Sequence, residues 1–344
     1  MIPSELSQDN VYVIAEAGCN HNGDFALAER LVDAAAATGA NAVKFQTFVP
    51  ERMITKGSPK ADYQIKATGT AESQFDRLRR MRLSREQHLS LIKRCQDKGI
   101  AFSSSAFDHE SLDLLAEFDL PFIKIPSGEI TNTPYLEHAA GLGIPVVLST
   151  GMSDLADIER ALNALAKGGV RDVVLLHCLS DYPSRWAEAN LRVIATLQQT
   201  FGLPVGFSDH SQGIELPLLA VALGAVMVEK HITLDRTMEG GDHKASLEPE
   251  PFTRMVSCIR RLGPALGDGI KRCMDSERNV RDVARKSIVA GRGIPKGAVL
   301  GPDDLLCKRP GTGIPPYEME KIIGLAAARD IAEDEMLSWT DLAT

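Results

Sequence analysis

The sequence predicts an α/β protein: a (β/α)8 barrel of the TIM type followed by a small β-rich domain. Eight short apolar runs recur about every 30 residues, the length of a strand–helix–strand unit, with helical periodicity between them. The runs are continuously apolar rather than alternating, as expected for parallel strands that are covered on both sides. A change of composition near residue 286 predicts the second domain.

The eight predicted strands cover residues 11–18, 41–46, 100–105, 121–128, 145–151, 172–178, 204–209 and 225–231. Helical periodicity is clearest over residues 26–38, 85–98, 154–166 and 190–200. Eight consecutive units imply a closed barrel, and their total agrees with the ~250 residues typical of that fold. No strand is followed by a GxGxxG turn, which disfavours a dinucleotide-binding fold.

The remaining chain divides into a linker and a small domain. We assign residues 1–266 to the barrel, the polar segment 267–285 to a linker, and residues 286–344 to the second domain. That domain has short β runs and many Gly and Pro residues. A domain this small buries little apolar core, so we expect it to dock onto a barrel or a second subunit.

Composition narrows the class of function. The net charge of −8 and the aromatic content of 5% argue against nucleic-acid binding, which needs basic surfaces and stacking platforms. The six cysteines are scattered without a CxxC pair, as in a reduced cytoplasmic protein. No apolar run approaches the length of a membrane span, so we expect a cytoplasmic protein without a membrane partner.

The link after Phe48 is unusually long and polar, extending over residues 49–64. Loops of that length in compact barrels are usually lids or binding loops, although a structural excursion is the alternative.

His210 and His231 end the seventh and eighth predicted strands, where parallel barrels carry their chemistry. Two imidazoles on neighbouring strands could hold one divalent metal ion, or each could be a hydrogen-bonded structural residue. Both histidines follow closely on a carboxylate, Asp209 or Glu229, and the pair together favours the metal site.

Lys44 and Lys124 lie in the second and fourth predicted strands, and serines follow at several strand ends. Two buried lysines beside hydroxyls favour a doubly anionic ligand, such as a phosphate with a carboxylate. A Schiff-base lysine and lysines that extend to solvent are the alternatives. Glu16 lies in an apolar run, so it needs a partner: either it activates water or a hydroxyl, or it pairs with a barrel lysine.

Two cysteines, Cys19 and Cys178, also fall near strand ends. His177 precedes Cys178, but adjacent residues of a strand face opposite sides, so we interpret both cysteines as ordinary thiols.

Several ordered motifs together resemble the N-acetylneuraminate (sialic acid) synthase family over nearly the whole chain. They include Ile14-Ala-Glu16-Ala-Gly-Cys-Asn20-His21-Asn22-Gly23, Val43-Lys44-Phe45-Gln46, Lys124-Ile-Pro-Ser127-Gly-Glu129, Leu148-Ser149-Thr150-Gly151-Met152, Phe207-Ser208-Asp209-His210 and Glu229-Lys230-His231. Gly241-Asp242-His243-Lys244 favours the sialic and legionaminic branch over the pseudaminic branch. The run Lys308-Arg309-Pro310-Gly311 resembles the family's SAF (antifreeze-like) domain.

This resemblance implies a synthase that condenses phosphoenolpyruvate with an open-chain N-acyl-mannosamine aldehyde and releases phosphate. N-Acetylmannosamine, giving N-acetylneuraminate, is the leading sugar. A legionaminate synthase using 2,4-diacetamido-2,4,6-trideoxy-mannose follows closely, and a 9-phosphate synthase comes next. The resemblance also implies Mn2+, with Mg2+ or Co2+ as alternatives, bound by His210 and His231 to polarise the aldehyde.

The resemblance assigns the remaining site residues as well. Glu16 would manage the proton or water of the reaction. Phosphoenolpyruvate would be bound by Lys44, Lys124, Ser127, Ser149, Ser180 and Ser208. The sugar would be bound by Gln46, Tyr182, Asp242 and Arg309. Arg309 would reach from the SAF domain of one subunit into the barrel of the other, which makes the protein a domain-swapped homodimer. Outside this class, the alternatives are a Schiff-base aldolase using Lys124 or Lys44, and a non-catalytic carbohydrate-binding protein.

Overall fold

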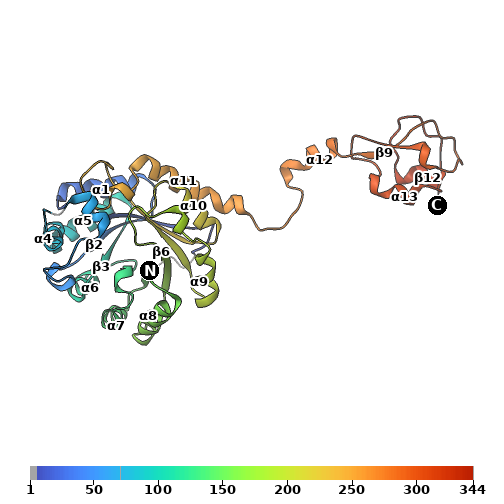
Figure 1. Cartoon of the computed structure of the whole chain (residues 1–344). Helices are drawn as coiled ribbons and strands as arrows, with labels where there is room; N and C mark the ends of the chain where they lie inside the picture. The colour runs from blue at the N-terminus through green and yellow to red at the C-terminus, as the bar shows by residue number, and fades with distance from the viewer. Residues whose placement is uncertain (1–5, 70, 344) are drawn as a thin grey trace. The chain divides into compact units, whose positions relative to one another are not determined.

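A computed structural model describes residues 6–69 and 71–343 of the chain (Figure 1). It contains two compact units, the first ending at Gly267 and the second beginning at Asp268. Within the described ranges, no helix combines the length and the apolar composition that a bilayer crossing requires.

The first unit is a closed barrel of eight parallel strands, which confirms the predicted fold (Figure 1). The strands are β1 (Tyr12–Gly18), β2 (Ala42–Thr47), β3 (Ala101–Ala106), β4 (Ile123–Ile125), β5 (Val146–Ser149), β6 (Val173–Cys178), β7 (Val205–Asp209) and β8 (Met227–His231). Each lies within a few residues of its predicted range. The barrel closes where β8 pairs with β1, with His231 beside Glu16, while Glu16 also lies beside Lys44 of β2.

Helices surround the barrel: α1 (Phe25–Ala37), α5 (Arg85–Lys98), α6 (His109–Ala116), α7 (Thr133–Gly141), α8 (Leu155–Lys167), α9 (Val193–Phe201), α10 (Glu215–Ala222) and α11 (Pro249–Leu266). Several begin at a residue whose side chain accepts a backbone N–H of the first turn, such as Asp24, Ser84, Asp108 and Asp154. The long polar link is not an irregular loop. It and the residues after it form α2 (Pro50–Met53), α3 (Asp62–Thr68) and α4 (Gln74–Met81).

The barrel interior changes from apolar to polar along each strand. A cluster of buried residues fills one end: Tyr12, Ile14, Ala42, Phe122, Val147, Val174, Leu176 and Met227. Because side chains two residues apart share a face of a strand, the next inward positions carry polar groups. Ile14 is followed inward by Glu16, Ala42 by Lys44, and Phe122 by Lys124. The polar side chains therefore lie at the carboxyl ends of the strands, and the packed apolar cluster lies beneath them in the barrel.

The second unit has its own small core, built mainly from aliphatic side chains such as Ile288, Leu300, Ile314 and Leu337. Strand β9 (Ser287–Ala290) pairs antiparallel with β10 (Leu305–Lys308), and β11 (Ala326–Ala327) with β12 (Leu342–Ala343). The unit also contains α13 (Met319–Ile322). The segment that we predicted to be a linker contains the short helix α12 (Arg278–Ala284).

Candidate active site

A cavity of about 230 Å³ opens at the carboxyl ends of the barrel strands. It is lined by every predicted site residue of the barrel except Asp242: Glu16, Lys44, Gln46, Lys124, Ser127, Ser149, Ser180, Tyr182, Ser208, His210 and His231. Residues from strands far apart in the sequence therefore converge on one pocket, as the predicted barrel requires.

The base of this cavity is a buried cluster of alternating charges, here called the charged floor: Glu16, Lys44, Glu229 and Lys124. Lys44 Nζ lies 2.8 Å from Glu16 Oε2 and 3.8 Å from Glu229 Oε2. Lys124 Nζ lies 3.6 Å from Glu229 Oε1. Both lysines are at most 3% exposed, which excludes lysines that extend to solvent. The floor thus balances two ammonium groups with two carboxylates.

Burial and these neighbours shift the pKa values of the charged floor in different directions. Burial, reinforced by Glu229 and opposed by Lys44, raises the pKa of Glu16 to about 7. Burial alone would lower the pKa of Lys44, but the Glu16 and Glu229 carboxylates outweigh it and raise that pKa. For Lys124 burial prevails and the pKa falls. Glu16 can therefore gain or lose a proton near neutral pH.

Hydroxyl groups surround the two lysines. Lys44 Nζ donates to Ser105 Oγ at 2.7 Å, and the backbone N–H of Gly151 donates to Ser127 Oγ at 2.9 Å. A Cβ at Gly151 would lie only 2.5 Å from Ser180 Oγ and 2.8 Å from Ser127 Oγ, so the absence of a side chain there lets these serines converge. Ser149 Oγ is buried without a hydrogen-bond partner in the described part of the chain. An unsatisfied buried hydroxyl fits a ligand-binding role.

The two predicted metal ligands face each other across the pocket, with ring centroids 5.4 Å apart. His210 Nδ1 lies 2.6 Å from the carbonyl oxygen of Leu179, which fixes the tautomer and leaves Nε2 as the acceptor. Burial and the charge of His210 hold the pKa of His231 well below its usual value, so that ring is neutral. Its buried Nδ1 has no partner among the described residues.

These donors fit a divalent ion held by two imidazoles. Within residues 6–69 and 71–343, no group of three or more His, Cys, Asp or Glu side chains is arranged to hold a metal ion. Water or substrate oxygens would therefore have to complete the coordination.

The carboxylate beside His210 in the sequence does not face the pocket. Asp209 points outward and forms a fully buried ion pair with Lys230, whose ammonium also donates to the carbonyl of Ser211. Glu229, by contrast, faces inward with His231. Strand alternation explains the difference, because His231 and Glu229 are two residues apart whereas Asp209 and His210 are neighbours.

Sequence reasoning missed several members of this pocket, among them Tyr63, Glu229 and Cys178. Tyr63 of α3 lines it and stacks on Tyr182 with ring centroids 4.9 Å apart. Glu229 was noticed only as a neighbour of His231. Cys178 also lines the pocket, and its Sγ lies 3.9 Å from His210 Nδ1. His177 faces away, as expected, and contacts the carbonyl of Ala189. Only a three-dimensional fold brings such residues together, since they come from separate elements.

Two predicted sugar-binding residues lie outside the cavity lining. Asp242 follows β8 in the loop before α11 and is partly buried. Arg309 belongs to the second unit, where its side chain is exposed.

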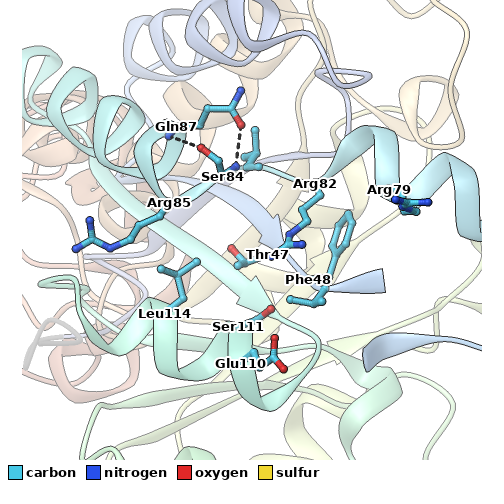
Figure 2. Close-up of a pocket in the computed structure, with 12 residues that line it drawn as sticks. Thr47, Phe48, Arg79, Arg82, Ser84, Arg85, Gln87, Glu110, Ser111 and Leu114 are labelled. Atoms are coloured by element: carbon cyan, nitrogen blue, oxygen red, sulfur yellow. Dashed lines mark hydrogen bonds between the residues drawn. The ribbon is translucent and has the colours of Figure 1, made fainter. Parts of the chain in front are cut away.

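Figure 2 shows the residues that line a second, larger groove of about 530 Å³. Phe48 lines the groove, Phe107 lines the pocket, and their rings meet edge to face at 6.2 Å. Two of the arginines that line the groove, Arg79 and Arg85, are exposed and paired with surface glutamates. No lysine or histidine lines this groove, so it lacks the buried charges that distinguish the strand-end pocket.

Comparisons with known proteins agree with this geometry. The model of the NeuB family matches residues 31–271, and that of the SAF domain matches residues 285–343. An N,N'-diacetyllegionaminic acid synthase of Campylobacter jejuni is 46% identical, over 94% of this chain and 98% of its own length. A synthase of the same name from Legionella pneumophila is 42% identical, over 95% and 93%.

Solved structures give the same result. The crystal structure of an N-acetylneuraminic acid synthetase from Leptospira borgpetersenii, in complex with citrate, superposes with a TM-score of 0.69. It is 37% identical and covers 79% of this chain and 90% of its own.

Proposed function

Because this chain belongs to the NeuB family and carries a SAF domain, we propose that it condenses phosphoenolpyruvate with an N-acylated amino-sugar aldehyde. The family resemblance indicated by the sequence motifs is thereby confirmed. The products would be a sialic-type nine-carbon acid and phosphate. The names of the relatives from Campylobacter jejuni and Legionella pneumophila favour 2,4-diacetamido-2,4,6-trideoxy-mannose as the sugar, ahead of N-acetylmannosamine.

The observation that carries this proposal is the charged floor with its surrounding hydroxyls. Phosphoenolpyruvate presents a phosphate and a carboxylate, and Lys44 and Lys124 offer two buried ammonium groups to receive them. Ser127, Ser149 and Ser180 supply hydroxyl donors at the same strand ends. The unpartnered Ser149 hydroxyl would be satisfied by a phosphate or carboxylate oxygen.

The reaction requires a proton acceptor, and Glu16 has the pKa for that role. C3 of phosphoenolpyruvate would form a bond to the aldehyde carbon while the C=O π pair moves to the aldehyde oxygen, which takes up a proton, and this leaves positive charge at C2. Water would add at C2, and the bond from C2 to the phosphate oxygen would then break to release phosphate. Ionised Glu16 would take a proton from the water, while Gln46, which donates to Glu16 Oε1 at 3.1 Å, would orient the carboxylate.

His210 and His231 would hold a divalent ion such as Mn2+, which when bound would polarise the aldehyde oxygen as a Lewis acid. Tyr182 lies against both imidazoles, with its ring centroid 4.0 Å from that of His210 and 5.8 Å from that of His231. The tyrosine ring would therefore exclude water from one side of the aldehyde.

Phosphate release measured with Mn2+ and phosphoenolpyruvate tests the proposal directly. Three aldehydes would be offered in parallel: the diacetamido sugar, N-acetylmannosamine and N-acetylmannosamine 6-phosphate. We expect the diacetamido sugar to give the fastest phosphate release. Release only with the phosphorylated sugar would indicate the 9-phosphate reaction, and release with none, in folded metal-loaded protein, would overturn the proposal.

A Schiff-base aldolase is the second candidate, because burial lowers the pKa of Lys124 toward the range of a reactive amine. Borohydride reduction in the presence of pyruvate separates the two. A covalent adduct on Lys124 would favour the aldolase, whereas the synthase forms no imine.

We also propose that Arg309 completes the sugar site of a partner subunit in a homodimer. Mixing two inactive variants, Glu16→Gln and Arg309→Ala, tests this. If Arg309 acts across subunits, mixed dimers contain one site with both residues intact and activity reappears. Activity that stays absent after subunit exchange would contradict the shared site.

A further inference from the structure

Arg77 is a largely buried residue whose guanidinium lines a cavity and has no protein partner in the described part of the chain. Its side chain on α4 is 5% exposed, and no hydrogen bond or ion pair joins its guanidinium to any residue that the structure describes. Arg79 and Arg80 of the same helix are exposed and pair with Glu51 and Glu72. Because this guanidinium lines a cavity and keeps its donors free of described protein partners, we looked for a ligand group that Arg77 could bind.

Its guanidinium lies directly behind the wall of the catalytic pocket. Nη2 is 3.2 Å from the position that a Cβ of Gly241 would occupy, and Tyr63 Cε2 is 3.7 Å from the same position. Tyr63 lines the catalytic pocket, whereas Arg77 lines a neighbouring cavity of about 410 Å³. Asn22, Glu239 and Gly240 also line that cavity. Tyr63 and Arg77 therefore line two different cavities and approach each other at Gly241.

Asp242 is the second charged group at this place. It is close enough to Arg77 for the two charges to affect each other, yet no ion pair forms within 4.0 Å. Its carboxylate likewise makes no side-chain hydrogen bond within the described part of the chain. A guanidinium only donates and a carboxylate only accepts, so a group between them must offer both an acceptor and a donor. A secondary amide does so, whereas a phosphate would be repelled by the carboxylate.

We infer that Arg77 and Asp242 together hold the second acylamino group of the sugar, the one that N-acetylmannosamine lacks. Arg77 donates to the amide carbonyl oxygen, and Asp242 accepts the amide N–H. This inference rests on the proposed function, in which Arg309 completes the sugar site from the partner subunit. Arg77 is then a specificity-determining residue that favours diacetamido sugars, since a site built for hydrogen bonds discriminates against substrates that leave its groups unpaired.

The test is Arg77→Met, assayed with the diacetamido sugar and with N-acetylmannosamine. Losing a charged hydrogen bond in a buried site is expected to raise the KM for the diacetamido sugar roughly 10- to 100-fold. The KM for phosphoenolpyruvate should not change, and the KM for N-acetylmannosamine should change less than about threefold. Arg79→Met removes the same charge from an exposed position of the same helix and should leave all three values unchanged.

Arg77→Lys keeps the charge without the planar fork and should give an intermediate KM. It also serves if Arg77→Met fails to fold, which thermal unfolding would reveal. Equal KM increases for both sugars, or no increase for either, would overturn the inference.

Calorimetric binding of the free sugars separates this failure from a failure of the proposed function. Weaker binding of only the diacetamido sugar to Arg77→Met supports the inference even without turnover. If the wild-type protein binds neither sugar, both proposals fail. If it turns over both sugars and Arg77→Met does not discriminate between them, only this inference fails.

Discussion

The catalytic pocket has two parts that are built differently. The charged floor comes from barrel strands, rests on a packed apolar plug, and holds its lysines within ion-pair distance of carboxylates. The rim, here defined as Tyr63 and Tyr182 of the pocket lining together with Asp242 and Arg77 just outside it, comes from loops and short helices outside the strands. A rigid floor suits the steps that every substrate shares, while a rim on separate elements can vary with the sugar. Changes to the floor should therefore affect all sugars equally, and changes to the rim should affect sugar choice.

The largest effect is expected from removing a floor lysine. Lys44→Met deletes the ammonium that contacts Glu16, Ser105 and Glu229, and it leaves two carboxylates facing an anionic substrate. We expect kcat/KM to fall roughly 10³-fold or more with every aldehyde, as for the loss of a major electrostatic contact. Lys98→Met, at an exposed surface pair, is the control. A loss confined to one sugar would contradict the division into floor and rim.

Removing a histidine should be next in size. His231→Ala should weaken Mn2+ binding more than ~100-fold, because even the loss of a residue that only supports a metal ligand can weaken metal binding by about that factor. Titration with Mn2+ followed by electron paramagnetic resonance measures this without turnover. His138→Ala changes an exposed histidine paired with Asp113 and should leave Mn2+ binding intact. Equal Mn2+ affinity in His231→Ala and wild-type protein would exclude the metal assignment.

The pH dependence of kcat/KM should follow Glu16. Its pKa is raised to about 7 by burial, so below that pH the carboxyl is protonated and cannot accept a proton. Activity should rise with pH up to about 7 and be roughly tenfold below its plateau at one pH unit lower. Glu16→Gln should remove this acidic limb and leave a low, flat profile. An unchanged limb in that variant would assign the pKa to another group.

The smallest effect should come from the rim aromatic. Tyr63→Leu removes the stack on Tyr182, and aromatic pairs contribute about 0.5–1.5 kcal/mol. The KM for the sugar should rise by roughly two- to tenfold, with phosphoenolpyruvate unaffected. Steady-state kinetics with each substrate varied in turn separates the two values. A change in the KM for phosphoenolpyruvate would place Tyr63 with the floor instead.

The lysines of the floor could be predicted from residue patterns alone, for a physical reason, whereas Tyr182 and Asp242 of the rim came only from the family resemblance, and Tyr63 and Arg77 were not predicted. Inward positions on a strand alternate, so Lys44, Lys124 and His231 could be placed at strand ends from the apolar pattern alone. Their pairing with Glu16 and Glu229 follows from barrel closure, which the repeat count implies.

The rim depends on contacts between elements that no local pattern encodes. Arg77 lies in a helix that also carries Arg79 and Arg80, and nothing in that run marks it as the buried member. The helices α2 and α3 are too short to produce a clear periodicity, so the segment that supplies Tyr63 was expected as a lid or binding loop without any named site residue.

The equal numbers of positive and negative groups in the charged floor have a thermodynamic consequence. The floor itself is near neutrality before phosphoenolpyruvate arrives, so the entering anion adds negative charge beside Glu16. Binding should then draw a proton onto that carboxyl, and the observed enthalpy should depend on the ionisation enthalpy of the buffer. Tight binding favours protonated Glu16, whereas hydration needs the ionised form. The enzyme's pH optimum is in this sense a compromise between holding its substrate and converting it.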